Sequence, residues 1–318
     1  MHEHDTSPVE NAIWSVLGGT PIADAASRAG TPPARLADAV ERYRTAGRAA
    51  LDACPEGWHQ VNIEFADYTA AEQAFRAYLL PSLRGAPDGA WWFLRKYPCW
   101  RLRVDPSPDT RAEDVVAHIT EALDSAVSWG VVKDWRPYLY EPESVAFGGL
   151  GGMTITHRVF HTDSIGVLDY HQHTAGETAS PLDAKATSLL VTTLFLRAAG
   201  LEWGEQGDVW GQIEAKRPLP EDVPADKVSA MADPMRQLLM LDAGSALADG
   251  LLAPLQSWVT GMEHGGRALA DAARDGRLGL GLRSVLSRHV LFHWNRMGFT
   301  ARQQAIWARA AREAVLGR

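Results

Sequence analysis

Hydrophobic and polar residues alternate along residues 58–65, which read Trp-His-Gln-Val-Asn-Ile-Glu-Phe. A period of two is typical of a strand that buries one face. Further along, two strand-like runs flank a tight turn at Tyr97-Pro98, and a last strand-like segment carries Pro137, which indicates a sheet edge or a bulge. The pattern therefore predicts four strands, at about residues 58–65, 91–95, 100–104 and 131–140.

Two amphipathic segments lie between these strands. Thr69 is placed to begin a short helix through Tyr78 that stops before Pro81, and a longer helix is expected at about 111–129, ended by Gly130. The resulting order of strand, helix, strand, strand, helix, strand is that of the ferredoxin-like split βαβ unit. We therefore expect a ferredoxin-like antiparallel sheet with two backing helices.

Both ends of the chain have helical patterns. Three helices are expected in residues 7–52, with a spacing that resembles a helix-turn-helix. The C-terminal helices are expected at about 152–174, 181–199, 225–243, 246–261, 266–275, 281–297 and 300–316. The predicted fold class is α+β, with a small helical N-terminal segment at 1–53, the ferredoxin-like region at 54–150 and a large helical part at 151–318.

The composition limits the class of protein. With 318 residues, 46% of them hydrophobic, the chain can bury a substantial core. Its net charge of −8, and the seven acidic residues against five arginines in residues 1–53, argue against a nucleic-acid partner. No run approaches the roughly 18–20 apolar residues of a membrane helix, so no membrane partner is expected and we place the protein in the cytoplasm. The 12 Trp residues fit either a surface that binds a peptide or an aromatic ligand, or a large core.

Several common chemistries have no motif in this sequence. A phosphate-binding G-x-x-x-x-G-K-[ST] loop, a dinucleotide glycine fingerprint and a G-x-S-x-G elbow are absent, which disfavours phosphoryl transfer, hydride transfer and triad hydrolysis. The two cysteines provide neither a disulfide framework nor a structural zinc site. His157 and His161 share a helix face, and His171-x-His173 follows, but no HExxH pattern supports them, so no metal site is expected.

Arg101 and Arg103 lie two residues apart on an expected strand, so both side chains project from the same face. Two adjacent guanidinium groups can hold a carboxylate or a developing oxyanion. Alternatively, they pair with Asp105, Glu141 or Glu143 in a structural network. Both interpretations stay open from the spacing.

Glu143 follows the last strand and precedes a glycine-rich turn, a loop position where catalytic side chains often lie. It is a candidate general base or a partner of the two arginines, and an exposed loop acid is the alternative.

A polar stripe marks one of the C-terminal helices. His289, His293 and Arg296 fall on one side at i, i+4 and i+7, among apolar neighbours. The stripe indicates a polar interior or a cleft, unless this side of the helix faces solvent.

Four segments in series resemble a known family: Trp-Arg-Leu-Arg103, Tyr140-Glu-Pro-Glu143 leading to Phe147-Gly-Gly149, Phe160-His-Thr-Asp163-Ser164, and His293-Trp-Asn-Arg296. In this order they are similar to the elimination domain of lantibiotic dehydratases and to thiopeptide-type bacteriocin biosynthesis proteins. In the elimination domains, paired arginines, a glutamate and a C-terminal histidine are implicated in removing glutamate from glutamylated Ser or Thr. The resemblance implies catalytic roles for Arg101, Arg103, Glu143 and His293, with Tyr140 and Ser287 as further candidates for proton transfer.

One position departs from this family. An arginine commonly stands immediately before the aromatic-Gly-Gly segment, and this chain has Ala146 there. Losing that cation weakens recognition of a departing glutamate carboxylate, because a buried anion needs a paired charge. Together with the short chain, the departure favours the pyridine synthases of thiopeptide biosynthesis.

The resemblance to pyridine synthases implies a substrate and a reaction. The partner is an azole-containing precursor peptide with a leader and two dehydroalanines, which a formal aza-[4+2] cycloaddition joins into a pyridine with loss of water and of the leader. No cofactor is expected, and other enzymes of the pathway are further expected partners. Two alternatives stay open: a lyase that eliminates glutamate, and a non-catalytic peptide-binding partner of a dehydratase. The residues expected to bind substrate or leader are Arg95, Lys96, Trp100, Asp163, Ser164, Trp294, Arg296, Arg42, Arg44 and Arg48.

Overall fold

The computed structural model describes residues 8–53, 58–85, 89–106, 110–175, 182–248, 250 and 252–317. Tertiary contacts divide the chain into two compact units, Met1–Glu56 and Gly57–Arg318. The second unit contains both the sheet and the C-terminal helices. A further division at residue 150 therefore stays a prediction.

The N-terminal unit is helical, as its pattern predicts. It consists of α1 (Pro8–Leu17), α2 (Ile22–Arg28) and α3 (Pro33–Ala53). A small core holds the three helices together, because apolar residues of each helix are buried against the others. The buried set is Ala12, Ile13, Val16, Ala25, Ala26, Leu36 and Val40.

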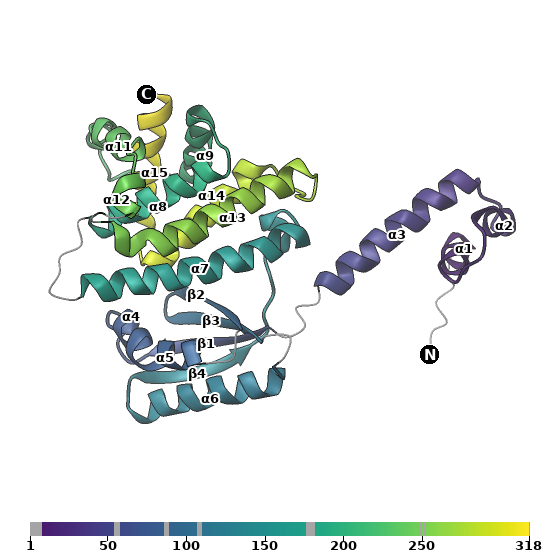
Figure 1. Ribbon diagram of the computed structural model, residues 1–318, viewed down its shortest axis with the longest axis horizontal. Helices are drawn as coiled ribbons and strands as arrows, with labels where there is room; N and C mark the ends of the chain where they lie inside the picture. Colours follow the sequence, from purple (N-terminus) through teal and green to yellow (C-terminus); the bar gives the residue numbers. More distant parts are fainter. Residues whose placement is uncertain are drawn as a thin grey trace. The chain divides into compact units, whose positions relative to one another are not determined.

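Four antiparallel strands form the sheet of the second unit, with the order β2-β3-β1-β4 (Figure 1). The expected edge position of the strand with Pro137 is confirmed, because β4 ends the sheet. The strand register places Gln60, Arg103 and Trp92 opposite one another on β1, β3 and β2, so their side chains share one face. The strands are β1 (His59–Phe65), β2 (Ala90–Lys96), β3 (Cys99–Asp105) and β4 (Val132–Tyr138).

The other face of the sheet is apolar and is packed against helices. Phe93 and Trp100 stack at 4.9 Å between ring centres, and Phe75 from the helix after β1 stacks on Trp100 at 5.3 Å. This helix is formed by α4 (Ala71–Ala74), a π-helical segment η1 (Phe75–Leu79) and α5 (Leu80–Gly85). Beside it lies α6 (Ala112–Ser128), which also contacts β4 (Figure 1). The expected mixed α+β class is thus confirmed.

The helix after β1 does not stop before Pro81, and that prediction was wrong. It continues to Gly85 because the π-helical segment interrupts the regular hydrogen bonding just before the proline. Pro81 thereby falls in the first turn of α5, where a missing N–H group costs little.

Several of the remaining helices differ in length or in their boundaries from those predicted from the sequence. Residues 256–274 form one helix, although Gly261, Gly265 and Gly266 read as a break. These glycines instead allow close packing, since an added Cβ would lie 2.4 Å from Thr162 at Gly261 and 2.4 Å from Val159 at Gly265. The expected helix at 225–243 is divided in two. The helices are α7 (Leu150–Thr174), α8 (Ala184–Ala198), α9 (Trp203–Lys216), α10 (Ala225–Ser229), α11 (Ala232–Leu239), α12 (Gly244–Ala248), η3 (Ala253–Leu255), α13 (Gln256–Arg274), α14 (Leu282–Met297) and α15 (Ala301–Leu316).

The helix α9 was not expected, because glycines at 204, 207 and 211 weaken its helical pattern. A capping box between Glu202 and Glu205 begins it. Gly207 then lets α15 approach closely, since an added Cβ would lie 2.5 Å from Leu316. Tertiary packing therefore stabilises a helix that local propensity disfavours.

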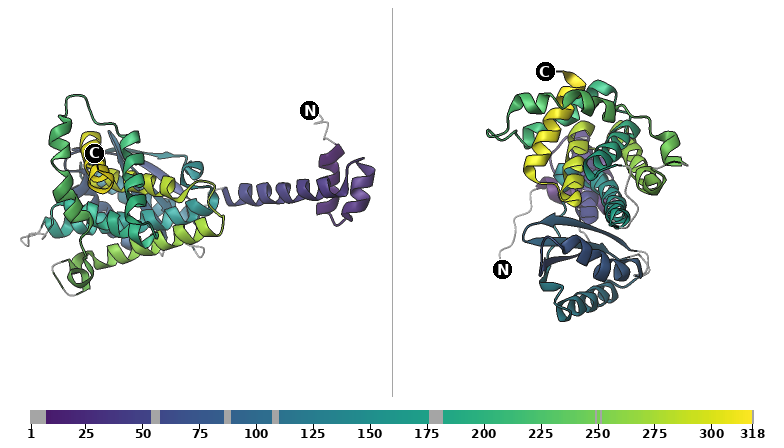
Figure 2. Two further views of the ribbon diagram at one scale, coloured as in Figure 1. Left: turned by 90° about the horizontal axis from the view of Figure 1, so that it is seen from above. Right: turned by 90° about the vertical axis from the view of Figure 1, so that its left-hand side faces the viewer.

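The helix α7 lies along the free edge of β2 and joins the sheet to the helical layer (Figures 1 and 2). The backbone N–H of Phe93 donates to Ser164 Oγ at 3.3 Å, and His161 Nδ1 lies 2.8 Å from the carbonyl oxygen of Trp91. Side chains of a helix thus cover backbone groups that an edge strand leaves unpaired. None of the described helices is long and apolar enough to span a membrane.

Candidate functional site

Arg103 is the centre of a cluster on the face of the sheet opposite to the Phe75 core. Its Nε donates to Gln60 Oε1 at 2.7 Å, and its guanidinium lies 4.0 Å from the centre of the Trp92 ring and 5.0 Å from that of Tyr140. Gln60 in turn donates to Asn62 at 3.3 Å. Arg103 Nη1 and the Trp92 indole N–H are buried without a hydrogen-bond partner among the described residues. Two oriented donors are therefore left in one cluster.

Tyr140 and His157 form the polar wall of this cluster. The Tyr140 hydroxyl lies 2.7 Å from His157 Nε2, and Trp58 packs on the imidazole with 4.3 Å between ring centres. Burial and the charge of Arg103 lower the pKa of His157 to about 4, so the imidazole is neutral at pH 7. Burial also raises the pKa of Tyr140, so its hydroxyl stays protonated at neutral pH while it is hydrogen-bonded to His157.

The outer part of the cluster is more exposed. Arg101 lies on the same face as Arg103, as the spacing predicts, opposite Asn62 on β1. Glu143 is exposed at the start of the short 3₁₀ turn Ser144–Phe147. Burial lowers the pKa of Arg103 to about 10, while Tyr140 and Glu143 oppose this shift. Glu143 therefore acts electrostatically on Arg103.

His293 does not join this cluster but lies in a buried network around Asp163. Asp163 Oδ1 is 2.9 Å from His293 Nδ1 and accepts from Trp258 Nε1 at 3.0 Å, and Asp163 Oδ2 accepts from Arg296 Nε at 2.6 Å. His293 Nε2 lies 2.8 Å from Ser188 Oγ. Burial alone would raise the pKa of Asp163, but the charges and hydrogen bonds of His293 and Arg296 outweigh it and lower the pKa.

Ser188, His293 and Asp163 have the connectivity of a hydrolase triad, but they are enclosed. Their relative exposures are 0%, 2% and 0%, so no substrate reaches them in this conformation. The expected polar interior of the His289, His293 and Arg296 stripe is confirmed, since all three are buried. His289 Nε2 lies 3.2 Å from Thr156 Oγ1, and burial followed by Arg296 lowers its pKa to about 3.

An aromatic pair connects the two groups. Trp92 and Phe160 lie 4.6 Å apart, with Arg103 against the first ring and Arg296 4.6 Å from the centre of the second. The Asp163 network is therefore linked to the Arg103 cluster through the packed rings of Trp92 and Phe160.

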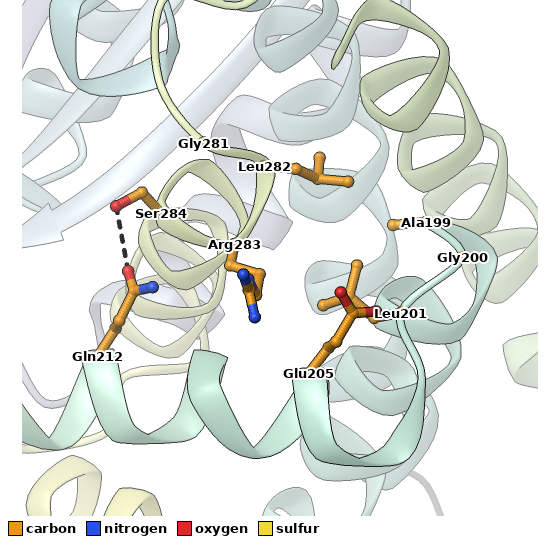
Figure 3. Close-up of a pocket in the computed structure, with 9 residues that line it drawn as sticks. All are labelled: Ala199, Gly200, Leu201, Glu205, Gln212, Gly281, Leu282, Arg283 and Ser284. Atoms are coloured by element: carbon orange, nitrogen blue, oxygen red, sulfur yellow. Dashed lines mark hydrogen bonds between the residues drawn. The ribbon is translucent and has the colours of Figure 1, made fainter. Parts of the chain in front are cut away.

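Ser287 lies elsewhere, against α9. It accepts a hydrogen bond from Lys216 Nζ at 3.1 Å and donates to the carbonyl of Ser284 at 2.8 Å. Nearby is a cavity of about 480 Å³ between the end of α8, α9 and the start of α14, where Ser284 donates to Gln212 at 3.1 Å (Figure 3). The structure thus does not bring Ser287 to the Arg103 cluster.

The residues expected to bind substrate are also dispersed. Trp100 and Trp294 are core residues at 1% and 0% exposure, Lys96 is exposed, and Arg95 projects from the opposite face to Arg103. In the N-terminal unit, Arg42 donates to the Asp38 carbonyl at 3.3 Å and Arg44 lies 3.9 Å from Glu41. The side chain of Arg48 lies outside the described residues.

Sequence reasoning missed four residues of the cluster: Gln60, Trp92, His157 as a partner of Tyr140, and Trp58. The sequence could have indicated Gln60, because this residue is a polar position of the alternating strand, and in the sheet it lies opposite Arg103. His157 was noticed only as a helix-face histidine. In the described parts of the chain, no three His, Cys, Asp or Glu side chains are grouped so as to hold a metal ion.

Several solved structures have a similar fold. The tRNA-dependent lantibiotic dehydratase MibB from Microbispora sp. 107891 matches with a TM-score of 0.58 and 18% identity over 82% of this chain, which spans 28% of MibB. The pyridine synthase TbtD from thiomuracin biosynthesis matches with a TM-score of 0.55 and 15% identity, covering 81% of this chain and 97% of TbtD. TsrL matches with a TM-score of 0.52 and 16% identity, covering 80% of this chain and 93% of TsrL.

A search of the curated protein sequences found no match. The model of the family described as lantibiotic biosynthesis dehydratase C-term matches residues 58–315, which contain the sheet and nearly all of the helical layer. The chain therefore belongs to the lantibiotic dehydratase C-terminal family.

Proposed function

We propose that the protein is a thiopeptide macrocyclase that forms a pyridine from two dehydroalanines of a precursor peptide. In a formal aza-[4+2] cycloaddition, one dehydroalanine and the imidic-acid tautomer of its preceding amide form the azadiene, and the second dehydroalanine supplies the alkene. Loss of the carbinol oxygen as water, and then of the leader as its carboxamide, makes the ring aromatic. No oxidant is needed, because these two eliminations supply the unsaturation.

The observation that carries this proposal is the pair of unbonded donors, Arg103 Nη1 and Trp92 Nε1, in one buried cluster. A preorganised donor in a water-poor site stabilises charge that develops on an amide oxygen. Gln60 and the Trp92 ring fix the guanidinium. Both donor atoms are covered in this conformation, so the amide reaches them from the exposed side of the cluster, where Arg101 and Glu143 lie, once the covering side chains move.

Proton transfer is assigned to the acidic and phenolic groups around Arg103. Arginine stays protonated and acts only as a donor. Glu143 takes the amide N–H proton, and the hydroxyl of Tyr140, held by His157, supplies a proton to the oxygen that leaves as water. Bringing the two alkenes together in one bound conformation replaces a large entropic cost.

Family membership and the residue at position 146 also support the cyclase. TbtD, whose fold this chain resembles, is a pyridine synthase. Ala146 leaves the turn without the cation that recognises a departing glutamate. The proposed partner is accordingly an azole-containing precursor peptide that carries its leader. The proposed interaction takes place in the cytoplasm. We propose a catalytic role for Arg101 beside Arg103, and a supporting role for His293.

The same comparison favours one other function, elimination of glutamate from a glutamylated peptide. MibB is a lantibiotic dehydratase, and the unbonded donors of Arg103 suit a glutamate carboxylate as well as an amide oxygen. A peptide-binding partner without catalysis needs none of these donors.

We further propose that residues 54–150 form a ferredoxin-like subdomain and 151–318 the helical part that completes the fold. The strand order β2-β3-β1-β4 supports the first assignment, since each of the two connecting helices joins strands separated by one other strand.

Mass spectrometry of a precursor before and after addition of the protein tests the function. A dehydrated, azole-bearing precursor should yield a free leader, a macrocycle and a pyridine absorption. A glutamylated precursor should release no glutamate. Glutamate release without ring formation would assign the chain to the lyases, and an unchanged precursor that still binds would assign it to the non-catalytic partners.

A further inference from the structure

Arg95 is held in a fixed position on the sheet face opposite to Arg103. It extends from β2, and its guanidinium lies 4.6 Å from the centre of the Trp100 ring. A Cβ added at Gly298 would lie 2.8 Å from Arg95 Nη1, so the guanidinium packs against the turn between α14 and α15. This arrangement leaves the planar group little freedom to turn.

One edge of this guanidinium has no partner. Arg95 Nε and Nη2 are buried without a hydrogen bond in the part of the chain that the structure describes. These two N–H groups form the edge that binds a carboxylate through two parallel hydrogen bonds. Burial lowers the pKa of Arg95 to about 10, against the influence of Glu72 and Tyr68, so the group remains cationic at neutral pH.

His171 adds a second unsatisfied group nearby. Its Nε2 is buried without a partner among the described residues, and burial and Arg95 lower its pKa to about 4. Glu72 lies 4.0 Å from His171 Nδ1, but its carboxylate is already hydrogen-bonded to Arg76. Glu72 acts on Arg95 electrostatically but is not hydrogen-bonded to its Nε or Nη2. A buried cation without a hydrogen-bonded counter-ion is costly, so this cluster is suited to receive an anion.

A cavity of about 570 Å³ adjoins the cluster between α4 and the C-terminal end of α7, which lie beside each other in Figure 1. Glu72 and Arg76 line the cavity together with Gln172, the neighbour of His171. Arg76 belongs to the π-helical segment η1, a type of irregularity that is frequent at functional sites. Glu72 thus belongs to both the cavity wall and the cluster.

We propose that Arg95 and His171 form a carboxylate-binding subsite, separate from the Arg103 cluster, that takes an Asp or Glu side chain or the C-terminal carboxylate of a peptide. The carboxylate enters by the cavity and displaces the Glu72–Arg76 pair. Its planar group lies along the free edge of Arg95, and His171 Nε2, as the protonated tautomer, donates a third hydrogen bond.

The position of this subsite sets a spacing in the peptide. His157 and His171 are 14 residues apart on α7, or about 21 Å at the rise of an α-helix. An extended chain covers about 3.3–3.6 Å per residue, so at least about six residues separate the bound carboxylate from a group at the Arg103 cluster. Only this spacing rests on the proposed function, since binding of a carboxylate does not depend on catalysis.

NMR of the full chain tests the subsite with small probes at constant ionic strength. N-acetyl-glutamic acid α-amide presents a side-chain carboxylate, N-acetyl-alanine presents a terminal carboxylate, and N-acetyl-glutamine amide presents none. The Nε–Hε signal of Arg95, assigned with Arg95→Lys, should move saturably with at least one carboxylate probe and not with the amide. The probe that binds more tightly identifies the source of the carboxylate.

Two variants separate the subsite from general binding. Arg95→Lys keeps the charge but loses both the two-donor edge and the Nε–Hε signal, so its binding is followed by the backbone amide signal of His171, and it should weaken at least tenfold. Arg111→Gln, in which an exposed arginine is replaced, should bind as the original protein does. His171→Gln, read by the same Arg95 signal, should weaken binding severalfold. The proposal is overturned if no carboxylate probe moves the Arg95 signal at tens of millimolar, or if His171→Gln and Arg111→Gln titrate alike. An outcome in which ring formation fails but the probes bind would reject the proposed function and leave the subsite intact.

Discussion

The guanidinium of Arg103 lies 4.0 Å from the centre of the Trp92 indole. The arrangement is stabilising because the cation meets the negative face of the ring and the contact is buried. It also fixes the direction in which Nη1 points. Because Phe160 lies on Trp92 and Arg296 on Phe160, the orientation of Arg103 depends on residues far from it in sequence.

Replacement of Arg103 by Lys should reduce ring formation by about 10²-fold or more, the usual cost of removing one oriented donor. Lysine keeps the charge but cannot donate to Gln60 and present a second planar donor from the same group. Single-turnover assays followed by mass spectrometry measure the effect. Arg136→Lys, on the same sheet face but exposed on the edge strand β4, is the matched control. Equal rates for the two variants would remove Arg103 from the reaction.

Ala146→Arg restores the cation that the wider family commonly has at this position. We expect the variant to gain measurable release of glutamate from a glutamylated peptide, because a carboxylate leaving near Glu143 acquires a counter-charge. Val145→Arg places the same charge on the neighbouring residue, which is 84% exposed, and should not gain this activity. Glutamate in the supernatant is the measured quantity. Release by the unsubstituted protein would favour the lyase.

Asp163→Asn should lower the free energy of unfolding by about 3–5 kcal/mol, because it leaves Arg296 charged and unpaired at 0% exposure. Urea unfolding followed by circular dichroism measures the change. Asp208→Asn removes a carboxylate paired with Arg283 at the surface, with side-chain exposures of 51% and 45%, and should cost less than about 1 kcal/mol. Similar losses in both variants would contradict the view that the Asp163 network is a buried structural support.

Gly166→Ala should destabilise the protein by about 1–3 kcal/mol or more, since the new methyl group would lie 2.0 Å from the Trp258 ring. Moving Trp258 would also break its hydrogen bond to Asp163. Gly204→Ala is the control, because an added Cβ meets nothing within 4 Å in α9 and should stabilise by up to about 1 kcal/mol. The difference between the thermal midpoints of the two variants tests the close packing of α7 and α13.

Stability should fall as the pH drops from about 6.5 to 4. His157 and His171 have pKa values lowered to about 4, and that of His289 is lowered to about 3, each first by burial. Because the unfolded chain binds protons near pH 6.5 and the folded chain does not, stability is full above that pH and is lost toward the folded pKa.

The unfolding free energy at pH 7, 6, 5 and 4 measures this dependence. His289→Gln should reduce its slope near pH 5 by about 1.4 kcal/mol per pH unit, the contribution of one proton. An unchanged slope would mean that His289 is protonated in the folded state.

The sequence by itself determined the elements whose patterns depend on local burial. Alternation predicted the first strand and strand-like runs bounded by turn residues predicted the other three. The i, i+2 spacing placed Arg101 and Arg103 on one face, because side-chain direction in a strand follows from backbone geometry alone. The polar stripe of α14 was likewise visible as a polar interior. The helix predictions were wrong at Gly207, Gly261 and Gly265, because the contacts that favour a helix there come from other helices.

Only the tertiary structure decided which polar groups meet. The family resemblance also implied a catalytic role for His293, yet Asp163 and Ser188 hold it in an enclosed network. Gln60 and His157 joined the Arg103 cluster because sheet register and helix packing bring together residues distant in sequence. Hydrogen bonds and desolvation act over a few ångströms. The spacing of residues along the sequence does not specify such short distances between residues of different helices and strands. These distances are set by the packing of the folded chain.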